Sequence, residues 1–146
     1  SELSGLVGDS FIPDCGQSAG NAEYGQGKPG ALGVPHLRSD ALPYLGVVSG
    51  FTVENARPGA LPIVVVGVNQ IAVPFDGGTL LASPQIVVQL PVPIAADGTL
   101  TVSAKIPADP SLCGLALHHQ VLIPDQSASG AYHLSMTNGL TRTLGN

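Results

Sequence analysis

The stretch Thr99–Ile106 reads TLTVSAKI, and its strict alternation decides the fold class. Leu100 and Val102 alternate with Thr101 and Ser103, so that apolar and polar side chains fall on opposite faces of an extended chain. A period of two residues indicates a β-strand with one face buried and the other in water. We therefore predict a half-buried strand at these residues.

Strand signals continue on both sides of this stretch at a spacing of roughly ten residues. Leu61–Val68 (LPIVVVGV) is apolar at nearly every position, which predicts a strand covered on both faces. Gln85–Ile94 contains Pro91 and Pro93, which predicts a place at a sheet edge. Ala96–Gly98 is expected to be a tight turn of the hairpin type. The other expected strands are Leu45–Asn55, Gln70–Phe75, Leu115–Ile123, Ala131–Thr137 and Leu140–Leu144.

Glycine and proline restrict the remaining choices. The 13 prolines and 19 glycines are spread along 146 residues, which leaves little room for helices and suits short strands joined by turns. We predict an all-β fold, a single-domain antiparallel β-sandwich of jelly-roll or immunoglobulin-like type with about seven to eight strands. The sandwich is expected over residues 23–146, after a Gly-rich N-terminal arm or strand over residues 1–22, and residues 16–21 and 24–30 are expected to be loops.

The charge pattern excludes two classes of partner. Charged residues make up 10% of the chain, the net charge is −5, and the five basic residues are scattered. Binding to phosphates by counterion release needs clustered cations, so we expect no nucleic acid and no anionic membrane surface as partner. No apolar run approaches the ~20 residues of a membrane span.

The two cysteines, Cys15 and Cys113, predict a long-range disulfide and hence an oxidising compartment, with two buried thiols as the alternative. The chain begins Ser1-Glu2-Leu3 without methionine, as a mature chain does after removal of a signal peptide. A recombinant truncation would look the same. We expect a secreted protein, extracellular or at the cell surface.

Four stretches share a pattern with a known kind of domain: Tyr24–Gly30 (YGQGKPG), Tyr44–Ala60 (YLGVVSGFTVENARPGA), Ile106–Asp125 (IPADPSLCGLALHHQVLIPD) and Met136–Leu140 (MTNGL). Together they resemble a recurrent β-domain found near the C-termini of secreted proteins of planctomycetes and similar bacteria. The resemblance covers about residues 24–145. It implies export, a sandwich fold and placement at a surface or in a matrix, and it carries no known catalytic residues.

Two cysteines of that pattern are absent. The family has cysteine where Lys28 stands and another near Gly78–Thr79, so a disulfide is missing as a pair. The resemblance implies that a disulfide between Cys15 and Cys113 replaces the family's disulfide.

Histidine and acidic residues offer weak candidates for chemistry. The neighbours His118 and His119 point to opposite faces of a strand, which predicts one surface and one packed histidine. His118, His133 and Asp125 would form a metal site only if their strands pair, and a calcium loop at Asp125–Ser129 is the other alternative. No G-x-S-x-G elbow is present. We therefore expect no enzyme, with no catalytic residues, no metal ligands and no cofactor.

Aromatic residues are few for a sugar-binding module, with no tryptophan, three tyrosines and three phenylalanines. Tyr132 alternates with Leu134 and is expected in the core. Tyr24 and Tyr44 remain as candidate ligand contacts.

Apolar residues exceed what one small core needs in Leu61–Val68 and in Ile86–Ile94, which predicts an exposed strand edge that serves as a contact surface. The arm could add a strand to a neighbouring subunit, as in donor-strand fibres, or pack on its own domain. Its candidate assembly contacts are Leu3, Leu6, Val7, Phe11 and Ile12.

These observations predict a non-enzymatic, secreted structural subunit of a fibre, surface layer or matrix, with other copies of itself as partners. The alternatives are an extracellular ligand-binding or adhesion module for polysaccharide or protein, and an unrecognised hydrolase.

Overall fold

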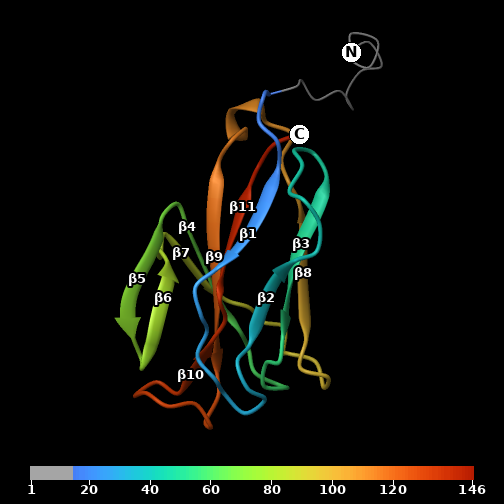
Figure 1. Ribbon diagram of the computed structural model, residues 1–146. Helices are drawn as coiled ribbons and strands as arrows, with labels where there is room; N and C mark the ends of the chain where they lie inside the picture. The colour runs from blue at the N-terminus through green and yellow to red at the C-terminus, as the bar shows by residue number, and fades with distance from the viewer. Residues whose placement is uncertain (1–14) are drawn as a thin grey trace.

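The computed structural model describes residues 15–146, which form eleven β-strands in three sheets (Figure 1). The largest sheet has the order β1-β11-β9-β4-β7, with β10 also paired to β9; the second is β2-β3-β8, and the third is the β5-β6 hairpin. Every named strand pair is antiparallel. The strands are β1 (Gly20–Tyr24), β2 (His36–Ser39), β3 (Val48–Glu54), β4 (Ile63–Gly67), β5 (Gln70–Phe75), β6 (Gly78–Ala82), β7 (Ile86–Gln89), β8 (Leu100–Lys105), β9 (Ala116–Pro124), β10 (Leu134–Met136) and β11 (Gly139–Thr143).

Figure 1 shows the six-stranded sheet between the β5-β6 hairpin and the three-stranded sheet. It has a hydrophobic core on each face. On one face Val64 of β4 packs with Phe51 of the three-stranded sheet. On the other face Val65 packs with Ala82 of the β5-β6 hairpin. Because neighbouring valines of β4 enter different cores, the prediction of a strand covered on both faces is confirmed, as is the all-β antiparallel sandwich.

Three strands were not expected from the sequence: β1, β2 and β6. β1 reads GNAEY and is mostly exposed, so it lacks an apolar face, and it begins at Gly20 inside an expected loop. β6 begins at Gly78, immediately after a turn in which Asp76 (φ 50°) and Gly77 (φ 79°) both adopt left-handed backbone. Two such residues make the tight turn typical of β-hairpins.

The tight turn expected at Ala96–Gly98 is present: Gly98 has φ 84°, and the N–H of Ala95 donates to the carbonyl of Thr99, but the turn does not join two paired strands. β7 pairs with β4 and β8 pairs with β3, so the two strands belong to different sheets. Backbone hydrogen bonds from Leu90 to Pro62 and from Ile94 to Ala60 hold the segment after β7 beside the chain that enters β4. The predicted edge position of this segment is confirmed, because β7 ends the six-stranded sheet.

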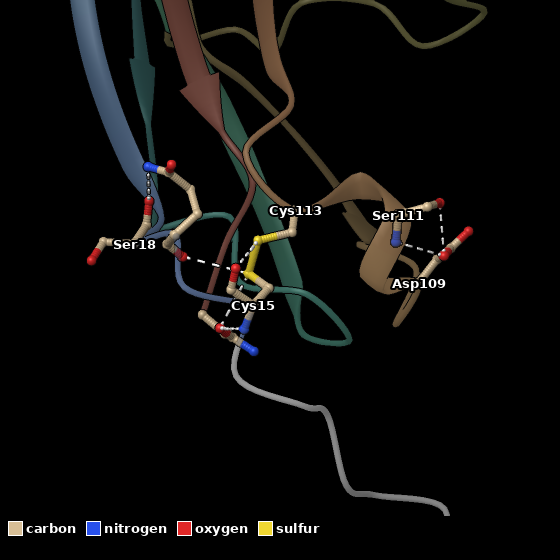
Figure 2. Close-up of a disulfide and its surroundings, with 7 residues drawn as sticks. Cys15, Ser18, Asp109, Ser111 and Cys113 are labelled. Atoms are coloured by element: carbon tan, nitrogen blue, oxygen red, sulfur yellow. Dashed lines mark hydrogen bonds between the residues drawn. A yellow bond between two sulfur atoms is a disulfide. The ribbon is translucent and has the colours of Figure 1, made fainter.

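The disulfide between Cys15 and Cys113 is confirmed, with the two Cα atoms 5.9 Å apart (Figure 2). It joins the segment before β1 to the short 3-10 turn Pro110–Leu112, which precedes β9. The backbone N–H of Cys15 also donates to the side chain of Asn146, 3.1 Å away. The N-terminal segment is therefore held to the chain's other end.

The expected assembly contacts of the arm, Leu3 to Ile12, lie outside the described residues. β1 spans the expected boundary between residues 22 and 23 and pairs along its whole length with β11. Within residues 15–146 no helix is long and apolar enough to cross a membrane.

Candidate functional site

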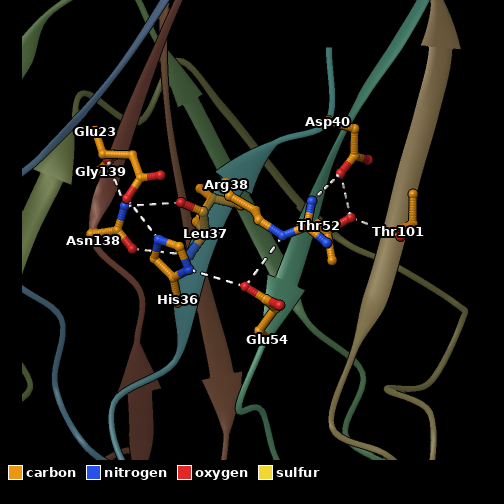
Figure 3. Close-up of polar contacts among 10 residues, drawn as sticks. All are labelled: Glu23, His36, Leu37, Arg38, Asp40, Thr52, Glu54, Thr101, Asn138 and Gly139. Carbon is orange, nitrogen blue, oxygen red and sulfur yellow. Dashed lines mark hydrogen bonds and ion pairs between the residues drawn. The ribbon is translucent and has the colours of Figure 1, made fainter.

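The two larger sheets meet along one side of the sandwich, where β1 and β2 lie together, and this side is closed by polar contacts. Figure 3 shows His36 of β2 between two carboxylates. Its Nε2 lies 2.6 Å from Glu23 of β1, and its Nδ1 lies 3.1 Å from Glu54 of β3. Both ring nitrogens must donate to satisfy these carboxylates, which favours the imidazolium form.

Asn138 joins the sheets next to this histidine. Its side-chain oxygen accepts the N–H of Leu37 at 2.9 Å, and its amide nitrogen donates to the carbonyl of Leu37 at 3.0 Å. The open hollow beside these residues has a volume of about 380 Å³, and Glu23, Val34 and His36 are among its lining residues. The closed side is therefore polar and carries a shallow hollow.

Stability should fall as pH rises through the titration of His36. Hydrogen bonding to Glu23, and secondarily to Glu54, raises the pKa of His36 above its ordinary 6.5. A raised folded-state pKa stabilises the fold fully below pH 6.5, and this contribution is lost as pH rises through the raised value. Denaturant melts of the intact chain and of His36→Gln should show a loss above pH 6.5 in the intact chain only. Parallel pH profiles for the two proteins would contradict this.

A buried ion pair fixes the β5-β6 hairpin. The Nζ of Lys28 lies 3.4 Å from the Asp76 carboxylate and also donates to the carbonyls of Asp76 and Ser129, and both side chains are buried. The same carboxylate accepts the backbone N–H groups of Tyr132 at 2.7 Å and Leu134 at 3.0 Å. These bonds, that of Tyr132 foremost, lower the pKa of Asp76. Sequence reasoning missed the pair because Lys28 lies in a Gly-rich stretch with no strand pattern.

The opposite side of the sandwich is open and apolar. Ile86, Val87 and Val88 of β7 are 55%, 56% and 46% exposed. These three residues with Gln89 are here called the β7 edge. Among the strands of the described chain, only β4 pairs with β7. The sequence placed this strand at an edge, but it did not predict that both of its faces would be in water.

The register of β7 on β4 fixes which backbone groups of the β7 edge are unpaired. Leu90 donates to Pro62, and Val88 lies opposite Val64 two residues further on. Antiparallel strands exchange backbone hydrogen bonds at every second residue pair. The backbone groups of Val88 therefore bond to β4, and those of Val87 and Gln89 point away from it. The N–H and C=O groups of Val87 and Gln89 are therefore directed away from β4, where no strand within residues 15–146 pairs with them.

Four other outer strands, β1, β2, β5 and β8, carry features that discourage pairing with a further chain. Charged or ionisable residues are present on three of them, as Glu23 on β1, Arg38 on β2 and Lys105 on β8. β5 has Pro74 and an irregular register. Charges, proline and bulges are the usual protection of a strand edge. The β7 edge has none of them, and no charged residue occurs between Asp76 and Asp97.

An apolar hollow of about 310 Å³ opens beside the β7 edge. Its lining comes from Leu90 and Val92, which follow β7, and from the first four residues of β8. Val92 is itself half exposed. The apolar surface thus continues from β7 into the gap between the two sheets.

The candidate metal ligands do not converge. His118 binds the hydroxyl of Thr141, His133 binds the carbonyl of Ala128, and the Asp125 carboxylate accepts backbone N–H groups of two loops. No group of three or more ligating side chains that could hold a metal ion occurs within residues 15–146. His118 is buried, so the expectation of a surface histidine there is wrong.

His119 is packed, as predicted, with its ring 5.6 Å from that of Phe51. Burial, with the nearby Arg142 guanidinium adding to it, lowers the pKa of His119 to about 4. Below pH 6.5 the unfolded chain binds a proton at His119, whereas the folded chain binds it only near pH 4. The free energy of unfolding therefore falls by about 3 kcal/mol as the pH falls from 6.5 to 4. His119→Phe should flatten this part of the pH profile in denaturant melts. An unchanged profile would contradict the assignment.

The tyrosines lie in different surroundings. Tyr24 donates its hydroxyl to the carbonyl of Leu81 at 2.5 Å, and Tyr44 is 40% exposed. The expectation that Tyr132 is a core residue is wrong: it is 69% exposed and stacks on Phe75 with ring centroids 5.9 Å apart. His133 has φ 52°, so the chain turns before β10 and the alternation with Leu134 does not extend back to Tyr132.

Comparisons with protein-family models, with curated proteins and with solved structures found no match to this chain.

Proposed function

We propose that this chain is a non-enzymatic, secreted structural subunit of an extracellular fibre, surface layer or matrix, and that it self-associates through strand edges. The β7 edge carries the proposal. An edge strand with three exposed apolar side chains, unpaired backbone groups and no charge is a template for pairing with another chain. The disulfide between Cys15 and Cys113 is compatible with an extracellular protein.

The contact between Lys28 and Gly78 supports the proposed kinship with the planctomycete-type domain. A Cβ atom built on Gly78 would lie 3.2 Å from the Cβ of Lys28. These are positions at or near which the family carries its missing cysteines, and a disulfide needs Cβ atoms roughly 4 Å apart. Lys28 and Gly78 are 50 residues apart in sequence, and a likeness in composition alone would not place them side by side.

Electron microscopy of three purified proteins tests the proposal: the intact chain, a chain without residues 1–14, and Val87→Lys. The truncation stops before Cys15 so that the disulfide is kept. We expect filaments or sheets from the intact chain and their loss in Val87→Lys. Loss in the truncated chain as well would mean that the arm takes part. Folded, dispersed monomers from the intact chain would contradict the proposed function.

A ligand-binding or adhesion module is the second candidate, and the exposed Tyr132 favours it. A tyrosine ring stacked on Phe75 at the surface is a platform on which a sugar could stack. Binding of soluble polysaccharides by the intact chain, lost in Tyr132→Ala and kept in Tyr44→Ala, would favour this function over assembly. Equal absence of binding in all three proteins would exclude that platform.

A further inference from the structure

We propose that two copies of this chain pair through β7, antiparallel and around a two-fold axis at Val88, so that their six-stranded sheets become one. This inference rests on the proposed self-association and specifies its contact. It follows from the unpaired backbone groups of the β7 edge, from its side chains and from the distribution of charge.

The unpaired groups select one register. Val87 and Gln89 direct their N–H and C=O groups outward, and pairing Val87 of one copy with Gln89 of the other satisfies all of them. Shifting the pairing in one direction brings in Gln85, whose N–H already donates to Ser83. Shifting it in the other brings in Pro91, which has no N–H. Only the register centred on Val88 pairs every outward N–H and C=O group of Val87 and Gln89.

The side chains fit this register. Val88 lies opposite Val88 of the second copy, and Ile86 lies opposite Leu90 of the second copy. Ile86 and Val88 are about half exposed in the single chain, so pairing removes apolar surface from water on both copies. Cross-strand pairs of β-branched residues are among the favourable ones in sheets.

Charge indicates a second copy as the occupant. A two-fold contact brings each surface patch against itself, so any charged residue near the axis would meet its like charge. Each copy carries a net charge of −5, yet the stretch between Asp76 and Asp97 is uncharged. The same pairing through β1, in which Glu23 is next to the central residue Ala22, would place two copies of Glu23 diagonally across the axis. Compared with the outer strands β1, β2, β5 and β8, the β7 edge is the best suited to meet its own copy.

A two-fold contact closes on itself and yields a dimer. Longer assemblies then need a second contact, for which residues 1–14 are the candidate segment. The β7 pair is therefore the repeating unit of the proposed fibre or layer, and the two contacts can be tested separately.

Cysteine cross-linking tests the register. In the proposed pair the two Val88 Cα atoms lie about 4.5 Å apart, within the range of a disulfide. We expect Val88→Cys to form a covalent dimer under mild oxidation. Val73→Cys, on β5 and equally exposed at 48%, should remain monomeric on a non-reducing gel. Circular dichroism of both variants establishes that they are folded.

Two results would overturn the β7 pair in different ways. If the intact chain self-associates but Val88→Cys does not cross-link and Val87→Lys still associates, the pairing is wrong and the proposed function stands. If the intact chain stays monomeric and Val88→Cys does not cross-link, both are wrong. Cross-linking of Val73→Cys to the same extent would show random collision and would also overturn the pair.

Discussion

Replacing Cys15 and Cys113 together by alanine is expected to lower the free energy of unfolding by about 4 kcal/mol. The disulfide joins residues 98 apart in sequence, so it closes a long loop and removes much conformational freedom from the unfolded chain. Guanidinium melts of the oxidised chain and of the double variant measure the difference. A similar loss should appear when the intact chain is melted in reductant.

The loss should be concentrated at one end of the molecule before global unfolding. Cys15 holds the chain that enters β1, and the last residues lie beside it because Cys15 and Gln17 bond Asn146. Hydrogen exchange in the double variant should therefore increase first in β1 and in its partner β11. Identical melts and identical exchange with and without the disulfide would contradict its stabilising role.

Replacing Lys28 by alanine is expected to lower the free energy of unfolding by about 3–5 kcal/mol, because it leaves the Asp76 carboxylate buried without its cation. Asp76→Ala should have an effect of similar direction, since it leaves the N–H groups of Tyr132 and Leu134 without an acceptor. Lys105→Ala, at an exposed position of β8, is the matched control and should change little.

The double variant of Lys28 and Asp76 distinguishes a coupled pair from two independent contacts. Because the two side chains share one site, the double variant should be destabilised by less than the sum of the single variants. Simple additivity in denaturant melts would contradict direct coupling. Single variants as stable as the control would show that the pair does not hold the hairpin.

The sequence predicts the strands whose apolar pattern is complete and misses those that depend on a neighbour. β8 alternates and β4 is apolar throughout, so both can be recognised alone. β1 and β2 are short and polar, and their strand conformation comes from pairing with β11 and β3. Nothing local to either stretch requires an extended chain.

The polar sites are less predictable than the strands, because they join residues far apart in sequence. Lys28 and Asp76 are 48 residues apart, and Asn138 and Leu37 are 101 apart. The contacts within these polar sites depend on how the sheets pack on one another. The alternation of apolar and polar residues along a strand does not specify that packing. The edge position of β7 is an exception, since Pro91 and Pro93 signal it directly.

Sedimentation velocity over a range of concentrations, with the intact chain beside Val87→Lys, tests most directly whether the β7 edge makes this protein a self-associating subunit. The intact chain should sediment faster as its concentration rises, whereas Val87→Lys should remain a folded monomer, because the two added charges would lie diagonally across the axis, about 7–8 Å apart, and Val87 would no longer bury apolar surface. A chain that stays monomeric throughout, or an association that Val87→Lys leaves unchanged, would contradict it.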